Sequence, residues 1–364
     1  MVKINILINC DRLEMGGAES HITALAIQLN ENGHQVYVAS WAFSSPKKRV
    51  LKQNRIRLID KSYNDLSGFL KTVRIDVIHS HQFASILESY KLAQKFNIKF
   101  GVTVHGLYDI YLDRSPLGFQ VAKAVDFVIV VDYSVKNFLI NIKNVPIAHD
   151  KIFLVPNGVN LEEFKPQPVS GKSKNTVSHI SRYGDRKEKA ALTLIKNIPE
   201  ISRKLPELIF QFVGNGPYYG VIEEEVKVAN KQIGRNTIRL LGERYDIPEI
   251  MANSYIILGS ERVAIEGMAS GRPTLLLSPK GYGGVIDQRN FKAMILTRKR
   301  HLSNYTKALI NDLIKLQNQQ FWEIKSRESR KIAEQFFDIR KITQKIEKIY
   351  RGKIYRGEEN IDGI

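Results

Sequence analysis

The sequence alternates short segments rich in β-branched residues with segments of helical periodicity, starting near its first residues. The β-rich segments are residues 4–8, 35–39, 56–59, 76–79, 100–104, 127–131 and 152–155. Helical patterns lie between them, among them residues 18–30, 85–96 and 133–140. Because strands that alternate with helices pair in parallel, this pattern predicts an α/β fold with an open, doubly wound sheet.

The same alternation begins again after a polar joint that contains proline. The joint consists of Pro166-Gln167-Pro168 and the polar residues 170–176, a composition typical of a connection between domains. Further strands are expected at residues 177–180, 209–213, 238–241, 255–258 and 274–277, with helices at residues 189–203, 218–232 and 263–270. We therefore predict two Rossmann-like domains with parallel sheets that face a central cleft, residues 1–168 and 169–330. The helices of residues 331–364 are expected to pack back across both domains and to end in a basic tail.

Length and composition limit the class of protein. A chain of 364 residues, 43% of them hydrophobic, is long enough for two packed domains. Its single cysteine, Cys10, excludes an internal disulfide framework and a clustered-cysteine zinc site. The first apolar run turns charged at Asp11-Arg12, too early for a secretory signal, and no apolar run approaches the ~18 residues of a membrane span. These features predict a cytoplasmic protein.

The chain is strongly basic. It has 55 Lys and Arg against 37 Asp and Glu, a net charge of +18 that favours an anionic partner such as phosphate, anionic lipid or nucleic acid. The densest basic run, residues 325–356, is interpreted as the solvated face of surface helices or as a contact with the inner membrane surface. Nucleic acid is not an expected partner, because the sequence has no aromatic-basic RNA motif and no helix-turn-helix pattern.

Ligands of doubly wound sheets bind beyond the carboxyl ends of the strands, so the loops there are candidate sites. Gly16 and Gly17 precede the first helix, where backbone N–H groups can approach an anion; a tight turn that needs glycine is an equal alternative. Arg182 and Lys187 follow the strand 177–180, and both can reach one diphosphate, although a solvated charge run has the same composition.

Two more loops follow strands of the second half. Gly214-Asn215-Gly216 ends the strand 209–213 in a glycine turn. Glu266 is predicted in the first turn of a helix, where the dipole favours a carboxylate that accepts two ribose hydroxyls; a capping role is the alternative.

Eight short motifs occur in a fixed order over most of the chain, and together they show a resemblance. They are Gly16-Gly17-Ala18-Glu19; Gly33-His34-Gln35-Val36; Asp76-Val77-Ile78-His79-Ser80-His81; Val104-His105-Gly106; Val155-Pro156-Asn157-Gly158-Val159; Ser181-Arg182 with Lys187; Val213-Gly214-Asn215-Gly216-Pro217; and Ile265-Glu266-Gly267-Met268-Ala269-Ser270-Gly271-Arg272-Pro273. In these motifs the chain resembles glycosyltransferase family 4, the retaining enzymes of the GT-B fold also described as glycosyl transferases group 1.

The resemblance implies roles for the matched residues. His105 would lie beside the donor sugar, and Arg182 and Lys187 would hold the diphosphate, so these three are the implied catalytic residues. No metal is expected, because fixed cations can stabilise the departing diphosphate. The residues implied to bind the donor, including two from a rebuilt loop, are Gly16, Gly17, Gly214, Gly216, Glu261, Arg262 and Glu266.

The sequence departs from the family at one position, and a second pattern resembles a metal site that the neighbouring residues do not support. Leu258 stands where the family has a second acidic residue that contacts the donor sugar, so Glu261, Arg262 and the segment Gly281-Tyr282-Gly283-Gly284 are candidate replacements. The spacing of His79 and His81 invites a metal site, but no nearby carboxylate or cysteine pattern completes a ligand set.

The sequence thus predicts a retaining, metal-independent hexosyltransferase of bacterial cell-envelope polysaccharide, glycolipid or surface-glycan synthesis. Its partners would be a nucleotide-sugar donor, a glycan or lipid-linked acceptor and an anionic membrane. One alternative is a degenerate GT-B module that binds a nucleotide sugar or glycan without transfer, which Leu258 favours. Epimerases and phosphorylases of the same fold also remain open.

Overall fold

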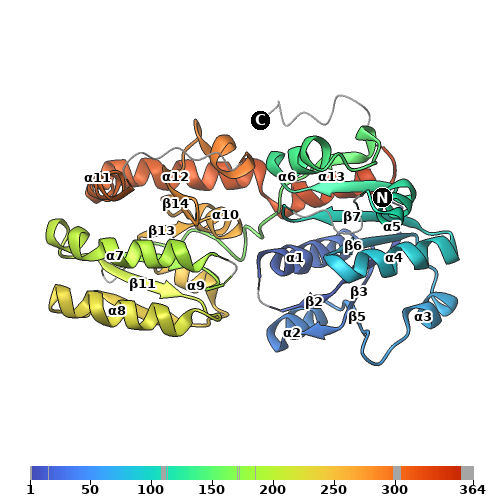
Figure 1. Cartoon of the computed structure of the whole chain (residues 1–364), viewed down its shortest axis with the longest axis horizontal. Helices are drawn as coiled ribbons and strands as arrows, with labels where there is room; N and C mark the ends of the chain where they lie inside the picture. Colours follow the sequence, from blue (N-terminus) through green and yellow to red (C-terminus); the bar gives the residue numbers. More distant parts are fainter. Residues whose placement is uncertain are drawn as a thin grey trace. The chain divides into compact units, whose positions relative to one another are not determined.

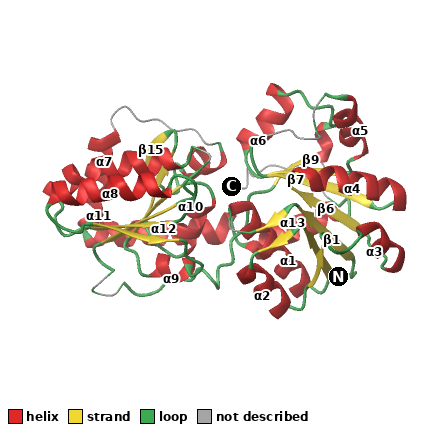
Figure 2. Cartoon of the chain, turned by 60° about the horizontal axis from the view of Figure 1, so that its bottom comes forward, coloured by secondary structure: helices red, strands yellow, loops and turns green. Residues whose placement is uncertain are grey.

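The computed structural model describes residues 2–14, 16–107, 112, 114–169, 171, 173–184, 186–297 and 305–353. The chain divides into two compact units. Unit 1 comprises Met1–Gly158 and Ile339–Ile364, and unit 2 comprises Val159–Asp338. Figure 1 colours the chain along its sequence, and Figure 2 shows that the strands of each unit lie between helices.

Unit 1 is built on a parallel sheet of seven strands in the order β5-β3-β1-β6-β7-β8-β9. Its strands are short and rich in Val and Ile, and most of their residues are buried, as expected for a sheet covered on both faces. The strands are β1 (Asn5–Cys10), β3 (Gln35–Ser40), β5 (Arg57–Asp60), β6 (Val77–His81), β7 (Lys99–Val104), β8 (Phe127–Val130) and β9 (Ile152–Leu154), with a separate parallel pair β2 (Arg12–Leu13) and β4 (Ala42–Phe43).

The helices of unit 1 connect these strands, and the last of them comes from the far end of the chain. They are α1 (Gly17–Glu31), α2 (Ser45–Gln53), α3 (Leu66–Thr72), α4 (Phe83–Phe96), α5 (Pro116–Ala124), α6 (Tyr133–Asn137) with a π-helical turn (Phe138–Ile142), a 3-10 turn (His149–Lys151) and α13 (Ile339–Tyr350). Helix α13 packs on α1 and buries its apolar face, Ile342, Ile346, Ile349 and Tyr350, in the core of unit 1.

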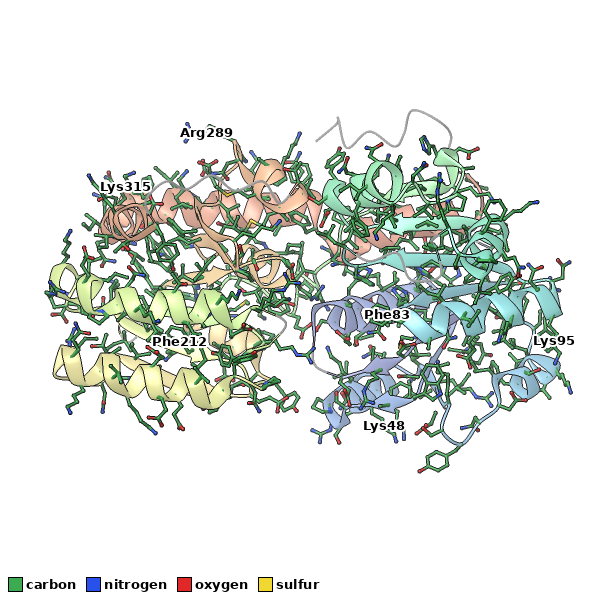
Figure 3. All side chains as sticks on the ribbon, in the orientation of Figure 1. Lys48, Phe83, Lys95, Phe212, Arg289 and Lys315 are labelled. Atoms are coloured by element: carbon green, nitrogen blue, oxygen red, sulfur yellow. The ribbon has the colours of Figure 1, made fainter. Side chains whose placement is uncertain are left out.

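Unit 2 repeats the arrangement with six strands in the order β12-β11-β10-β13-β14-β15, all parallel except β15. The strands are β10 (Thr176–Ile180), β11 (Ile209–Val213), β12 (Ile238–Gly242), β13 (Ile256–Gly259), β14 (Thr274–Ser278) and β15 (Gly281–Val285). The helices are α7 (Glu188–Lys204), α8 (Tyr219–Ile233), α9 (Ile247–Ala252), α10 (Arg262–Ala269), a π-helical turn (Lys292–Leu296), α11 (Tyr305–Gln317) and α12 (Gln319–Phe336). Phe212 of β11 is fully buried in the core of this unit (Figure 3).

The α/β class with parallel sheets is confirmed, but the division of the chain differs from the expected one. The sequence placed the boundary near residue 168, at the Pro-containing joint, whereas the chain leaves unit 1 after Gly158. The joint belongs to unit 2, where the ring of Pro166 packs against Gly271 and the carbonyl of Gln167 accepts a hydrogen bond from Arg272 at 2.9 Å. A proline-rich segment can therefore be anchored rather than serve as a linker.

The C-terminal helices also divide differently from the prediction. Helices α11 and α12 belong to unit 2, and only α13 returns to unit 1. The outgoing and returning segments run beside each other, since Val159 forms a parallel bridge with Asp338 and the N–H of Val159 donates to the carbonyl of Phe337 at 2.7 Å. Unit 2 is thus inserted between two parts of unit 1.

Candidate functional site

In unit 2, the order of the strands reverses beside β10. The chain passes from β10 to β11 and β12 on one side, and β13 then pairs with the other side of β10. In doubly wound sheets, ligands bind beyond the carboxyl ends of the two strands at such a reversal. Arg182 follows β10 there, and Glu261 follows β13, so two of the predicted site residues lie at this edge.

Gly214 and Gly216 allow the loop that carries Arg182 to pack on the loop after β11. Their φ angles are 140° and 152°, and a Cβ at Gly214 would collide with the carbonyl oxygen of Ser181. The N–H of Ser181 donates to the carbonyl of Val213 at 3.0 Å, which ties the two loops together. Gly214 and Gly216, which were predicted to bind the donor, therefore allow the two loops to lie in close contact at the edge of the sheet.

Lys187 and Glu261 connect the loops on the two sides of the reversal. Lys187 Nζ lies 3.0 Å from Glu261 Oε2, and each side chain is 42% exposed. Lys187 is also the N-cap residue of α7, while Glu261 precedes α10 with a φ of 54°, a left-handed conformation that is uncommon outside glycine. A half-exposed ion pair contributes little to stability, so the ammonium of Lys187 remains exchangeable.

Glu266 lies deeper in the same edge and pairs with Arg262. Arg262 Nε is 2.7 Å from Glu266 Oε1, and both side chains are at most 10% exposed. Helix α10 begins at Arg262, so Glu266 lies in its second turn; the prediction of the first turn was wrong. The carboxylate is therefore held by a neighbouring guanidinium rather than by the helix N-terminus, because a helix dipole acts mainly within one turn.

The position that departs from the family pattern is part of the core. Leu258 is fully buried in β13, and its carbonyl contacts His179 Nδ1 at 3.1 Å. The segment Gly281-Tyr282-Gly283-Gly284, a candidate replacement for the missing acid, forms the antiparallel edge strand β15. Tyr282 donates from its hydroxyl to Asp312 at 2.7 Å, so this segment has a structural role in the sheet.

In unit 1, the strand order reverses between β1 and β6, and Gly16 and Gly17 lie at that edge. Gly16 is the N-cap of α1, and Gly17 is its first residue. The carboxylate of Glu19 folds back against Gly16, where a Cβ would collide with it. Gln82 Nε2 donates to Glu19 Oε1 at 2.8 Å. The N-terminus of α1 therefore already has an acidic side chain beside it.

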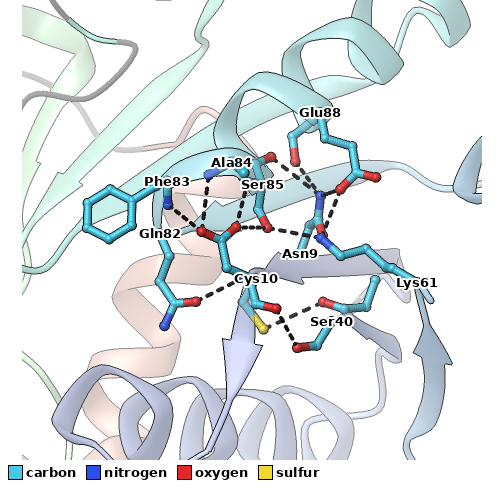
Figure 4. Close-up of polar contacts among 12 residues, drawn as sticks. Asn9, Cys10, Ser40, Lys61, Gln82, Phe83, Ala84, Ser85 and Glu88 are labelled. Atoms are coloured by element: carbon cyan, nitrogen blue, oxygen red, sulfur yellow. Dashed lines mark hydrogen bonds and ion pairs between the residues drawn. The ribbon is translucent and has the colours of Figure 1, made fainter. Parts of the chain in front are cut away.

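A second acidic side chain at this edge accepts hydrogen bonds from the free backbone N–H groups at the N-terminus of α4. The sequence analysis missed it. Asp11 follows β1, and its carboxylate accepts from the N–H groups of Phe83 at 3.1 Å, Ala84 at 3.1 Å and Ser85 at 2.7 Å (Figure 4). Gln82 Oε1 accepts in turn from the N–H of Asp11 at 2.9 Å. Asp11 and Gln82 directly follow the two strands at the reversal, so the rule used for Arg182 would have found them.

A buried lysine lies next to Asp11, since both side chains contact the hydroxyl of Ser85. Lys61 Nζ contacts Asn9 Oδ1 at 2.8 Å, Ser85 Oγ at 3.0 Å and Glu88 Oε2 at 2.9 Å (Figure 4). It also lies 3.2 Å from the centre of the Trp41 ring, and burial lowers its pKa. All three N–H donors of the ammonium are used, so Lys61 connects β1 and α4 at the edge of the sheet.

His105 follows β7 and is part of a cluster of four histidines in unit 1. His81 Nδ1 lies 3.0 Å from His105 Nε2, and the two rings are stacked with centroids 5.3 Å apart. The ring centroid of His21 lies 5.6 Å from that of His105, and the tilted rings of His79 and His81 have centroids 4.3 Å apart. Burial lowers the pKa of His79 to about 3 and that of His81 well below its ordinary value, so both rings are neutral at pH 7.

Within the described part of the chain, no three His, Cys, Asp or Glu side chains are placed to hold one metal ion. Both ring nitrogens of His79 have other partners, Tyr350 Oη and Thr103 Oγ1, each at 2.7 Å. A surface hollow of about 600 Å³ lies along the C-terminal half of α8 and contains none of the predicted site residues.

The basic C-terminal run is partly engaged in contacts within the protein. Lys325 is buried between Asp287 at 3.0 Å and Glu328 at 2.8 Å, and Arg330 donates to the carbonyls of Leu161, Phe164 and Ala269. Helix α13 directs its apolar residues into the core and exposes its lysines, which fits a solvated face and a membrane contact equally. Residues 354–356 lie outside the described residues.

A second basic surface lies on and after α2. Residues 45–57 contain Lys47, Lys48, Arg49, Lys52, Arg55 and Arg57 and no acidic residue. Most of these side chains are exposed, as Figure 3 shows for Lys48. Among the described residues, no helix is both long and apolar enough to cross a membrane.

Two doubly wound units on one chain, each with polar groups at its strand reversal, define the GT-B class. The solved structure of a glycosyltransferase from Rickettsia africae ESF-5 matches with a TM-score of 0.74 and 18% identity, over 98% of this chain and 100% of that one. Anabaena Alr3699/HepE in complex with UDP matches with a TM-score of 0.71 and 18% identity, over 96% and 100%.

Family profiles agree with the fold. Residues 15–163 match Glycosyltransferase Family 4, and residues 174–315 match Glycosyl transferases group 1. The chain belongs to this glycosyltransferase family, as the eight motifs predicted.

Two curated relatives have a higher sequence identity to this chain than these two structures. One subunit of the phosphatidylinositol N-acetylglucosaminyltransferase of Homo sapiens is 26% identical over 68% of this chain and 54% of its own length. The chain thus matches about half the length of that relative. The UDP-Gal:alpha-D-GlcNAc-diphosphoundecaprenol alpha-1,3-galactosyltransferase of Escherichia coli is 23% identical over 80% of this chain and 79% of its own length.

Proposed function

We propose that this chain transfers a sugar from a nucleotide-diphosphate donor to an acceptor hydroxyl, with retention of configuration and without a metal ion. The observation that carries the proposal is the pair of cations at the strand reversal of unit 2. Arg182 is exposed there, and Lys187 forms a half-exposed pair with Glu261. A forked guanidinium and a point-charged ammonium together suit a diphosphate.

In the proposed reaction, the acceptor hydroxyl attacks the anomeric carbon from the side that the diphosphate leaves. The bond from that carbon to the phosphate oxygen breaks with its electron pair on the diphosphate, which takes the hydroxyl proton. Arg182 and Lys187 stabilise the charge that develops on the leaving group, and they are positioned before the reaction begins. Lys187 exchanges the carboxylate of Glu261 for a phosphate oxygen when the donor binds.

Glu266 is proposed to accept hydrogen bonds from the ribose of the donor. Arg262 holds its carboxylate at 2.7 Å in a nearly buried position, and a carboxylate has lone pairs for several donors at once. Gly214 and Gly216 allow the backbone to approach the nucleotide, since a side chain at either position would collide with the neighbouring loop. The Anabaena structure similar in fold contains UDP, which supports a nucleotide donor.

The acceptor is proposed to be a lipid-linked or envelope glycan on the inner face of a membrane. Both curated relatives described above carry a phosphorylated lipid in their names, phosphatidylinositol in one and diphosphoundecaprenol in the other. The exposed cations of α2 provide a surface for anionic headgroups. In liposome flotation, we expect recovery to depend on anionic lipid and to fall in Lys48→Glu/Arg49→Glu; equal recovery from neutral vesicles would count against the contact.

A module that binds a nucleotide sugar without transfer is the second candidate, because Leu258 is locked in the core where the family has an acid. The two candidates differ in turnover but not in binding. A donor that stabilises the protein yet is neither transferred nor hydrolysed would favour the second candidate.

The experiment that tests the site is a thermal-shift panel of UDP, GDP, ADP, CMP and their sugar conjugates. A ligand that binds only the folded chain stabilises it, by about 2.7 kcal/mol when the free ligand is at a hundredfold excess over Kd. The melting temperature of the protein rises as a result. We expect a shift with one diphosphate family, kept in EDTA and lost in Arg182→Ala and Glu266→Ala. Arg203→Ala, an exposed arginine at the other end of α7, is the matched control. No shift with any nucleotide would overturn the donor site.

A further inference from the structure

Glu188 is a nearly buried acidic residue that the proposed reaction does not use. It is the first residue of α7, directly after Lys187, and it is 6% exposed. Its Oε2 atom is buried and has no hydrogen-bond partner among the residues that the structure describes. A buried carboxylate without a partner is costly, because water no longer solvates its charge. Such a group in a folded protein therefore needs an explanation.

The position of Glu188 on α7 indicates where its side chain is directed. Ala191, Ile195 and Ile198 follow it on the same helical face and are buried in the core of unit 2, so Glu188 lies on the face that packs on the sheet. Because side chains of a helix lean toward its N-terminus, the carboxylate is directed past the first turn of α7. That end of the helix lies at the carboxyl end of β10, at the strand reversal that carries Arg182.

The same side of the sheet contains the position where the family pattern has an acid. Leu258 of β13 is buried in the cluster that also contains Ala191 and Ile195 of α7. Its side chain therefore faces α7, the helix that Glu188 begins. Glu188 thus brings a carboxylate from the helix to the side of the sheet where the strand has a leucine.

The chemistry of a carboxylate limits what can bind to it. An ionised carboxylate only accepts hydrogen bonds, so its ligand must offer O–H or N–H groups, and the phosphates of the donor would be repelled. The ribose hydroxyls are already assigned to Glu266. Since Glu188 directly follows Lys187, which is proposed to bind the diphosphate, the hydroxyls of the sugar attached to that diphosphate are the remaining hydrogen-bond donors next to it.

We propose that Glu188 accepts hydrogen bonds from the hydroxyls of the donor's sugar. The proposal rests on the proposed function, because it requires the diphosphate to bind at Arg182 and Lys187. Hydrogen bonds to a charged acceptor are about twice as strong as those between neutral groups. The sugar therefore supplies the partners that the buried carboxylate lacks in the free protein, and its binding offsets the cost of burying that charge.

Isothermal titration calorimetry of the full chain tests whether Glu188 binds the sugar or the nucleotide. The probes are UDP, UDP-galactose and UDP-N-acetylglucosamine, with GDP and GDP-mannose as a second series. In Glu188→Gln, which keeps the size of the side chain, we expect the Kd of the preferred sugar conjugate to rise about tenfold and that of the bare diphosphate to stay within about twofold. Equal changes for the conjugate and the diphosphate, or no change for either, would overturn the proposal.

The stability of the free protein separates binding from a structural role. Glu188→Gln should leave the melting temperature unchanged or raise it, because burying an unpartnered charge costs more than the helix dipole returns at this position. Glu200→Gln is the matched control, since Glu200 is an exposed glutamate of the same helix, and its Kd values should not change. A melting temperature of Glu188→Gln clearly below that of the control would mean that Glu188 supports the fold, which would overturn the proposal.

The unsubstituted chain distinguishes failure of this proposal from failure of the proposed function. If it binds none of the five probes, the donor site of the proposed function fails, and the role of Glu188 fails with it. If it binds a diphosphate and its sugar conjugate, and Glu188→Gln binds the conjugate equally well, only the role of Glu188 fails. A selective loss of affinity for the conjugate in Glu188→Gln supports both.

Discussion

The two units have the same doubly wound design, but they differ in the charged side chains at the carboxyl ends of their strands. In unit 2 the loops at the strand reversal carry Arg182 and Lys187. In unit 1 the corresponding helix N-termini are already covered by the carboxylates of Asp11 and Glu19, and the nearby His79 and His81 are neutral. A doubly wound fold can bind an anion at either edge, and the cations Arg182 and Lys187 lie at the edge of unit 2.

The largest expected effect concerns the shape of the unit 2 edge. Gly214→Ala should lower the free energy of unfolding by at least about 3 kcal/mol and abolish nucleotide shifts, because its Cβ would collide with the Ser181 carbonyl. Gly33→Ala in unit 1 is the control, since Gly33 also has a positive φ, 91°, but open space around it. It should cost only about 1–2 kcal/mol. Urea unfolding of both variants measures the difference, and equal costs would show that the edge is not tightly packed.

The charge difference between the edges is tested by removing one cation. Lys187→Ala should lower turnover about a hundredfold, since it removes a fixed charge that we propose acts on the leaving group. Lys204→Ala, at the opposite end of α7, should leave kcat within about twofold. Steady-state kinetics with the donor found in the thermal-shift panel makes the comparison. Similar rates for the two variants would contradict the phosphate role of Lys187.

The neutral histidines predict that unit 1 is the more acid-sensitive unit. His79 has a pKa of about 3 in the folded chain against an ordinary 6.5, and the pKa of His81 is also well below that value; in unit 2, His179 has a pKa of about 4. Each buried neutral ring stabilises the fold fully above about pH 6.5 and loses that contribution as the pH falls, because only the unfolded chain then takes up the proton.

Among the described residues, unit 1 has two such rings and unit 2 has one, so the stability of unit 1 should fall about twice as steeply between about pH 6.5 and about pH 5. Hydrogen exchange of β6 and β10 at several pH values compares the units directly. His79→Gln should reduce the slope for β6 and leave that for β10 unchanged. A steeper loss in β10 would contradict the assignment of neutral rings to unit 1.

The smallest effect is expected for the ion pair that Lys187 forms within unit 2. Glu261→Gln should change stability by less than about 1 kcal/mol, because both side chains are 42% exposed. Glu14→Gln in unit 1, which breaks the exposed pair with Arg12, should behave alike. Thermal melts of the two variants would sharpen the comparison. A large loss in Glu261→Gln alone would mean that Lys187 is not readily exchangeable.

The sequence predicted the sheet-forming segments well because most of them are Val- and Ile-rich runs that are buried on both faces. It missed β15, whose sequence Gly281-Tyr282-Gly283-Gly284-Val285 has little strand propensity and depends on pairing with β14. The segment containing Pro166 resembled a linker, but its packing on Gly271 could not be seen without the fold. Tertiary contacts overrode local composition in both cases.

Positions at the carboxyl ends of strands were predictable from the motifs, as for His105, directly after β7, and Arg182, two residues after β10. Residue pairs were not predictable, because Lys187 and Glu261 are far apart in the sequence and meet only when β10 and β13 become neighbours. The same holds for Asp11, which reaches the first turn of α4 across the strand reversal. A count of basic residues does not show which of them are exposed, since the ammonium of Lys325 is buried between two carboxylates.

The insertion of unit 2 between Gly158 and Ile339 affects the order in which the protein can be made. A ribosome releases β1 to β9 first, yet the core of unit 1 lacks Ile346, Ile349 and Tyr350 until α13 has been translated. Unit 2 is complete in the sequence before α13 appears, so the part synthesised second can finish folding first. During translation of unit 2, the face of α1 that will receive α13 stays uncovered, and a nascent chain stalled there would offer apolar surface to chaperones.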